Sequence, residues 1–170
     1  GLEYTTLNLV HGEITPMRYG GNYKSYGPQY PRGIQEGNGV PADGDLWVSY
    51  SVNKEDMWIS RIPVPVEINA SAHADDDFSK NKSIAELTDW NIYSPVWAPV
   101  SLEDQWLKLQ DKDPFDYAKV ERKIPASKEL KVSFDLKAAQ NNKGTLQIEF
   151  LDENGIACSR MELTDDGIFR

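Results

Sequence analysis

"GDLWVSYSVNKEDMWISRIPVPV", residues 44–66, decides the fold class of this chain. Residues 46–52 alternate apolar and small polar side chains, 53–56 form a polar turn, and 57–62 alternate again. The closing "PVPV" ends the pairing, because a proline has no amide proton to give a neighbouring strand. The stretch therefore predicts an antiparallel β-hairpin.

Large apolar side chains lie on both faces of this predicted hairpin. Val48, Tyr50 and Val52 share one face, whereas Trp47 lies on the other. A two-stranded hairpin is not stable by itself in water, so neighbouring elements have to cover it. We therefore expect protein on both faces.

Composition supports a soluble all-β chain of short strands. The 170 residues are 39% hydrophobic and 11% aromatic, and 12 glycines and 10 prolines are spread along the chain. No apolar run approaches the roughly 20 residues of a membrane-spanning helix. The net charge of −9 argues against a nucleic-acid partner, because phosphate binding needs clustered lysine and arginine. A neutral or cationic ligand is easier to accommodate, although a locally basic pocket can still hold an anion.

The N-terminal segment is rich in glycine and tyrosine. "HGEITPMRYGGNYKSYGPQYPRGIQEGNG", residues 11–39, contains seven glycines and four tyrosines and shows neither helical nor strand periodicity. A loop of this length is usually functional when it is ordered. We predict an ordered loop rather than a disordered tail, because tyrosine is uncommon in disordered segments.

The remainder of the sequence predicts a connector followed by a meander of strands. Residues 67–100 are expected to be a surface connector, and Trp106–Leu109 a strand. Residues 130–137, 145–151 and 156–163 alternate as strands of a sheet with one solvated face. A sandwich needs about seven strands, so this domain is expected to be incomplete. Cys158, the single cysteine, is expected to be a buried, inert thiol. One cysteine cannot form a disulfide within the chain, so the sequence does not indicate an oxidising or a reducing compartment.

Several of these stretches together resemble one family of proteins. "LWVSYSVNKEDMWISRIPVPV", "WNIYSPVWAPV", "DKDPFDYAKVERKIP" and "GTLQIEFLDENG" resemble the C-terminal part of bacterial sialidase-like β-propeller proteins of the BNR type, followed by a concanavalin-like β-sandwich. The sialidase Asp-box, Ser-x-Asp-x-Gly-x-x-Trp, does not occur in the sequence. The resemblance therefore implies the fold more strongly than it implies sialic acid as the substrate.

The resemblance implies an all-β chain with late β-propeller blade elements and a partial concanavalin-like β-sandwich. The expected division is a blade-like segment over 1–66, a connector over 67–115 and a partial sandwich over 116–170. A blade hairpin is covered by adjacent blades, which explains why both faces carry a tryptophan, Trp47 on one and Trp58 on the other.

Four residues are candidates for catalysis. His11 and Glu13 are two positions apart and would share a face of an extended strand, where a carboxylate can tune the histidine for acid–base work. Tyr23 could act as a glycosidase nucleophile, with Glu36 as its nearest carboxylate partner. The alternative is that the histidine makes one structural hydrogen bond at the surface and that the tyrosines pack the loop.

Five further residues are candidates for substrate binding. Arg18 and Arg32 flank the tyrosine-rich stretch, and a guanidinium can hold the carboxylate of an acidic sugar with two parallel hydrogen bonds. Tyr19 and Tyr30 can offer ring faces and hydroxyl groups to a sugar. Lys54, in the hairpin turn, could reach a ligand, although a structural turn is the alternative there.

No cofactor or metal site is assigned. "HADDDF", residues 73–78, comes nearest to a calcium motif but lacks the spacing of an EF-hand loop, so a calcium ion stays unassigned. The resulting expectation is a part of a secreted or periplasmic glycoside hydrolase that is sialidase-like. Its partners would be carbohydrate and the remainder of a larger propeller protein. The alternative is a non-catalytic carbohydrate-binding β-sandwich module.

Overall fold

The computed structural model describes residues 9–34, 44–66, 70–114, 116–139 and 142–170. The chain divides into two compact units. The larger unit contains the described residues up to Ile124, and the smaller contains those from Pro125 to Arg170.

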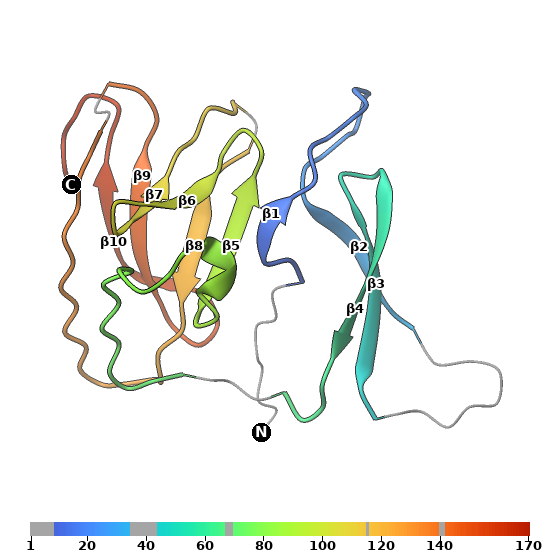
Figure 1. Ribbon diagram of the computed structural model, residues 1–170, viewed down its shortest axis with the longest axis horizontal. Coiled ribbons are helices and arrows are strands. Elements are labelled where there is room, and N and C mark those ends of the chain that lie inside the picture. The colour runs from blue at the N-terminus through green and yellow to red at the C-terminus, as the bar shows by residue number, and fades with distance from the viewer. Residues whose placement is uncertain (1–8, 35–43, 67–69, 115, 140–141) are drawn as a thin grey trace. The chain divides into compact units, whose positions relative to one another are not determined.

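Strands form the regular structure of the described ranges (Figure 1). In chain order the elements are β1 (Gly12–Ile14), β2 (Pro28–Ile34), β3 (Leu46–Val52), β4 (Asp56–Ile62), the 3-10 helix η1 (Ile84–Glu86), β5 (Trp90–Pro95), β6 (Val100–Glu103), β7 (Trp106–Leu109), β8 (Lys119–Arg122), β9 (Leu146–Leu151) and β10 (Ala157–Leu163). No α-helix occurs in these ranges, and the sheets are open. The prediction of an all-β fold is confirmed.

The predicted hairpin forms strands β3 and β4. They pair antiparallel with Tyr50 opposite Trp58, and β2 completes the sheet in the order β2-β3-β4. Strand β2 lies at the edge and starts with Pro28, and its pairing with β3 shifts register between Gln29 and Arg32. An edge strand tolerates proline because one side of it needs no partner. The sequence analysis missed β2 for this reason.

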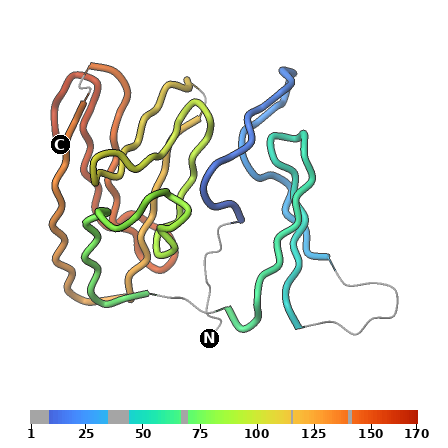
Figure 2. Tube along the Cα trace, in the orientation of Figure 1, coloured from blue at the N-terminus to red at the C-terminus, as the bar shows by residue number. Residues whose placement is uncertain are grey.

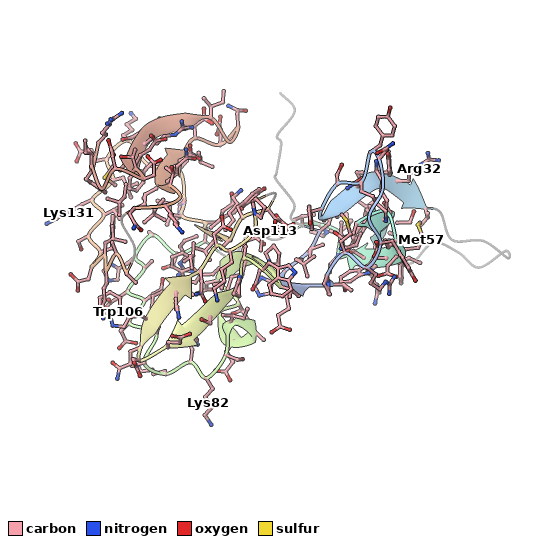
Figure 3. The ribbon with its side chains drawn as sticks, turned by 90° about the horizontal axis from the view of Figure 1, so that it is seen from above. Arg32, Met57, Lys82, Trp106, Asp113 and Lys131 are labelled. Carbon is pink, nitrogen blue, oxygen red and sulfur yellow. The ribbon has the colours of Figure 1, made fainter. Side chains whose placement is uncertain are left out.

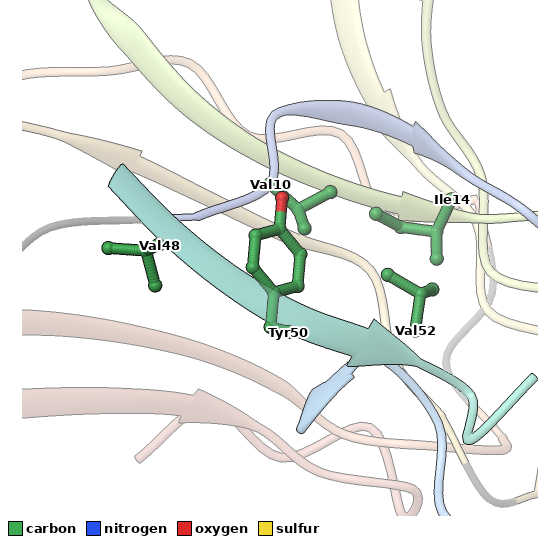
Figure 4. Close-up of a cluster of buried hydrophobic side chains, with 5 residues drawn as sticks. All are labelled: Val10, Ile14, Val48, Tyr50 and Val52. Carbon is green, nitrogen blue, oxygen red and sulfur yellow. The ribbon is translucent and has the colours of Figure 1, made fainter. Parts of the chain in front are cut away.

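One face of the β2-β3-β4 sheet carries the first hydrophobic core. Val48, Tyr50 and Val52 of β3 are buried and pack with Val10 and Ile14 from the β1 region (Figure 4). The Tyr50 hydroxyl donates a hydrogen bond of 3.0 Å to the carbonyl of Leu9, which satisfies its buried polar atom. Burial of each of these side chains contributes roughly 1.5–3 kcal/mol.

The opposite face of this sheet is open within the described residues. Met57 is 74% exposed and Ile59 is 61% exposed on β4 (Figure 3 labels Met57). Trp47 is half-buried, and the guanidinium of Arg61 lies 5.7 Å from its ring. The described residues cover one face of the hairpin, and the expectation that adjacent blades cover the other stays a prediction.

A second core lies under strands β5 to β8. Strand β5 pairs in parallel with β1 and antiparallel with β8, and β6 pairs with β7. Leu87, Ile92 and Val100 are buried there and pack against half-buried apolar neighbours. The predicted strand at β7 is confirmed, whereas the aromatic run that forms β5 was predicted only as part of a connector.

The acidic run at 73–78 has a structural role in the described ranges. Asp76 lies 3.3 Å from the Nε atom of Arg122, and its carboxylate accepts a hydrogen bond of 3.2 Å from the indole of Trp90. Asp77 accepts a hydrogen bond of 3.0 Å from the amide of Ser79. These contacts hold the connector onto the second core.

In the smaller unit, β9 and β10 form an antiparallel pair. In the turn between them, the carboxylate of Asp152 accepts hydrogen bonds from the amides of Asn154 and Ile156. Cys158 is exposed on β10, so the expectation of a buried thiol was wrong. The alternating sequence around Cys158 forms strand β10, and the side chains at the start of this strand are exposed within the described residues.

The predicted strand at 130–137 does not form. The segment runs as an extended, unpaired stretch of chain (orange in Figure 2). Leu130, Val132, Phe134 and Leu136 are each 45–52% exposed. The alternation is present in the sequence, but a strand needs a hydrogen-bonded neighbour, and no strand pairs with this segment in the described part of the chain.

Candidate functional site

A buried asparagine fixes the glycine- and tyrosine-rich loop to the hairpin turn. Asn53 is 2% exposed and has a positive φ of 57°, a conformation that asparagine tolerates better than most residues. Its side-chain oxygen accepts a hydrogen bond of 2.8 Å from the amide of Gly27, and its side-chain nitrogen donates one of 2.6 Å to the carbonyl of Thr15. Asn53 therefore connects two points of the loop, at Thr15 and at Gly27, to the hairpin turn.

A second anchor is the carboxylate of Glu55 in the same turn. It accepts hydrogen bonds of 2.8 Å from the amides of Arg18 and Tyr19, and one of 2.9 Å from Nζ of Lys24. Burial would raise the pKa of Glu55, but the hydrogen bonds from Arg18, Lys24 and Tyr19 outweigh it and lower the pKa to about 2. The hairpin turn thus serves to hold the loop.

The positive side chains predicted to bind substrate take part in this anchoring. The guanidinium of Arg18 lies 2.6 Å from Asp56 and 3.4 Å from Glu55. Nζ of Lys54 donates a hydrogen bond to the carbonyl of Tyr23 and lies 5.6 Å from the centre of the Tyr30 ring. The structure brings Lys54, Tyr23 and Tyr30 together, and it brings Arg18 to the acidic end of the turn.

The predicted tyrosines present their rings to solvent. Tyr19, Tyr23 and Tyr30 are 67%, 90% and 62% exposed, respectively. Ordered rings at the surface can receive a sugar ring, because an aromatic side chain combines an apolar face with a polar hydroxyl group. Their role in binding stays a prediction.

The remaining predicted residues lie on strands or outside the described ranges. His11 and Glu13 are exposed on either side of buried Gly12, so they share the outer face of the β1 region as predicted. Arg32 is exposed on β2, opposite Ser49. Glu36, the predicted partner of Tyr23, lies outside the described residues.

A polar hollow of about 440 Å³ opens in the larger unit beside this loop. Its lining residues are Lys24, Ser25, Tyr26, Tyr93, Asp116 and Tyr117. The Tyr93 hydroxyl donates a hydrogen bond of 3.1 Å to one oxygen of Asp116, and the amide of Tyr117 donates one of 2.9 Å to the other oxygen. The rings of Tyr93 and Tyr117 are 5.5 Å apart and tilted by 42°.

Burial and nearby acids perturb the ionisable groups of this hollow. Asp116 is 9% exposed, and burial raises its pKa above the usual value, with the charges of Asp113 and Asp111 acting in the same direction. Burial, followed by the charge of Asp116, also raises the pKa of Tyr93. Perturbed groups that line one cavity are typical of a functional site.

Glycine at position 27 permits the close approach of the loop to β5. Gly27 has a φ of +75°, and a Cβ atom placed on it would lie 3.0 Å from the Tyr93 hydroxyl. Any larger residue would displace the hydroxyl that holds Asp116. The neighbouring loop residues Lys24, Ser25 and Tyr26 line the hollow.

The sequence analysis did not select the residues of this hollow. Tyr93 lies in the predicted connector, and Asp116 and Tyr117 lie in "DKDPFDY", residues 111–117, which spans the boundary between the predicted connector and the predicted partial sandwich. The available signal was the mixture of carboxylates and aromatic rings in this short stretch, which is a composition suited to sugar binding. In the described part of the chain, no three side chains of metal-ligating type converge on one point.

Two comparisons connect the chain with sialidases. Residues 90–170 match a family model described as "Sialidase-like, CBM domain", where CBM denotes a carbohydrate-binding module. A solved structure titled "Sialidase" is 92% identical to this chain, with a TM-score of 0.70. The match covers 99% of this chain and 16% of that chain. No curated protein matches.

The described residues form an all-β structure, and both matches make the chain similar to parts of sialidases. The predicted resemblance to sialidase-like proteins is confirmed, and residues 90–170 are similar to the carbohydrate-binding domain of that group. The chain spans 16% of the length of the solved sialidase that it matches. A search of the described helices finds none that is long and apolar enough to cross a membrane.

Proposed function

We propose that this chain is the carbohydrate-binding part of a larger, secreted or periplasmic glycoside hydrolase of the sialidase-like type. The observation that carries the proposal is the match of residues 90–170 to the sialidase-like carbohydrate-binding family. In this proposal the chain holds glycan while residues elsewhere in the longer protein cleave it. Its partners are carbohydrate and the remainder of that protein.

Exposed apolar surface supports the second partner. The outer face of the β2-β3-β4 sheet carries exposed Met57 and Ile59, and the unpaired segment carries exposed Leu130 and Phe134. Exposed apolar side chains that follow a strand pattern usually meet another protein surface. We propose that the first surface meets a neighbouring propeller blade and that the second joins further strands of a concanavalin-like sandwich.

Affinity electrophoresis tests the binding proposal. The folded 170-residue chain is run through native gels that contain a neutral or an anionic polysaccharide. We expect retardation in at least one of the gels, together with no release of reducing sugar when the chain is incubated with the same polysaccharides. Equal migration in every gel would remove carbohydrate binding from the account.

The exposed tyrosine loop favours a second candidate function, a contribution to a catalytic centre completed by the longer protein. Tyr23 is 90% exposed, and the same loop carries Arg18, whose amide donates a hydrogen bond to Glu55. In the longer protein, Tyr23→Phe would then abolish turnover, and Arg18→Ala would raise KM. Unchanged kinetics in both variants would eliminate this loop from catalysis.

A further inference from the structure

The hollow around Tyr93 and Asp116 has the properties of a sugar subsite. It combines a carboxylate that is 9% exposed with tyrosine rings from two separate segments of the larger unit. Sugar sites typically pair an aromatic face with a few fixed polar groups that orient the ring. Tyr117 is 58% exposed, so its ring is accessible at the rim of the hollow.

The charges of the hollow indicate which sugars fit. Asp116 lies at its wall, and Asp113 and Asp111 act on it as further negative charges. The lysine among the lining residues, Lys24, is already paired with Glu55 at 2.9 Å. An ionised carboxylate accepts hydrogen bonds and donates none, which suits the hydroxyl groups of an uncharged sugar. The carboxylate of an acidic sugar would instead meet repulsion.

We propose that the hollow between Tyr93, Asp116 and Tyr117 binds an uncharged sugar unit and rejects a sugar that carries a carboxylate. In this arrangement, sugar hydroxyl groups donate to the Asp116 carboxylate, and the apolar face of the sugar stacks on Tyr117. The inference deepens the proposed carbohydrate-binding function and rests on it. In this inference the hollow binds an uncharged unit of a glycan, whether or not other units of that glycan are charged.

The fixed geometry of Asp116 supports this assignment. Its two oxygens are oriented by the Tyr93 hydroxyl at 3.1 Å and by the Tyr117 amide at 2.9 Å. A carboxyl oxygen can accept more than one hydrogen bond, so these contacts leave acceptor capacity for a ligand. A group held in place before binding loses little conformational entropy when the ligand arrives.

An NMR titration of the folded 170-residue chain tests the proposal. The probes are the neutral sugars lactose, maltotriose and xylotriose, and the anionic sugar trigalacturonate, in which every unit carries a carboxylate. We expect at least one neutral probe to shift the amide signals of Tyr93, Asp116 and Tyr117, with a Kd of about 1 mM. Trigalacturonate should bind at this position at least about fivefold more weakly than the best neutral probe, because of like-charge repulsion.

Two variants separate charge from shape. Tyr117→Ala should weaken the best neutral probe about tenfold by removal of the stacking ring. Asp116→Asn keeps the size of the side chain and should reduce the preference for neutral over anionic sugar to about onefold. Trp106→Ala is the matched control, because Trp106 is an exposed aromatic residue on β7 outside the lining of the hollow, and it should leave binding unchanged.

The outcomes distinguish this inference from the broader function. If the chain is retarded in polysaccharide gels but no neutral probe shifts the signals of the hollow, the subsite is wrong and carbohydrate binding stands. If trigalacturonate binds in the hollow as tightly as the neutral probes, the charge argument is wrong. If neither gels nor titrations detect any sugar, both proposals fail together.

Discussion

At the level of single residues, Asn53 connects the tyrosine loop to the sheet. Asn53→Ala would remove the acceptor for the Gly27 amide and the donor for the Thr15 carbonyl at a site that is 2% exposed. We expect the free energy of unfolding to fall by about 2–3 kcal/mol, because buried polar groups lose their partners and alanine tolerates a positive φ poorly. Urea denaturation followed by tryptophan fluorescence measures this loss.

The matched control is Asn22→Ala, at an exposed position in the same loop. An exposed substitution without buried partners should change the free energy of unfolding by less than about 0.5 kcal/mol. Equal losses in the two variants would mean that Asn53 does not anchor the loop.

The low pKa of Glu55 gives the stability a predictable pH dependence. Its pKa is about 2 in the folded chain, against an ordinary value of 4.5, so the unfolded chain takes up the proton first as the pH falls. The stabilisation from this carboxylate is complete above about pH 4.5 and is lost as the pH falls towards about 2. Glu55→Gln should therefore show a flatter decline in melting temperature over this range, as measured by circular dichroism. Parallel curves for the two proteins would contradict the assignment.

At the level of elements, the two faces of the β3–β4 hairpin should respond differently to truncation. Val52 is fully buried, whereas Ile59 is 61% exposed. Val52→Ala should reduce the free energy of unfolding by about 2 kcal/mol through lost packing and a cavity, and Ile59→Ala by less than about 1 kcal/mol. Chemical denaturation of both variants measures the difference. A larger loss for Ile59→Ala would show that the outer face is covered after all.

The hairpin could be predicted because its pattern is strong and local. Its alternation and polar turn determine β3 and β4 without reference to other elements. Strand β2 could not be predicted, because Pro28 and the irregular backbone at Tyr30 interrupt the alternation that marks a strand. Its pairing also depends on β3. The 130–137 stretch shows the opposite case, in which the alternation is present and no partner strand pairs with it in the described ranges.

The candidate site could be predicted only in part, for a similar reason. The tyrosine loop is one continuous stretch, so its composition is visible in the sequence. The polar hollow needs Tyr26, Tyr93 and Asp116, which are far apart in the chain and meet only through the loop anchors and the pairing of β5. Sequence patterns show local periodicity and do not show contacts between residues that are far apart in the chain.

At the level of the whole molecule, limited trypsin digestion should separate ordered from unpaired chain. Lys131 and Lys137 lie exposed in the unpaired stretch, whereas the Arg122 side chain is 13% exposed and is paired with Asp76 and Asp89. Proteases cut backbone that can adapt to their active site, so Lys131 or Lys137 should be cleaved before Arg122. Mass spectrometry of the earliest fragments gives the order. Earliest cleavage after Arg122 would contradict the described pairing of β8.

The account as a whole depends on the binding of glycan by this chain. A glycan array probed with the folded, labelled 170-residue chain measures this property over many sugars at once. We predict retention on a subset of glycans that present uncharged sugar units, with Tyr117→Ala giving a weaker signal on the same spots. A folded chain that is retained on no glycan, at concentrations up to about 1 mM, would contradict the account.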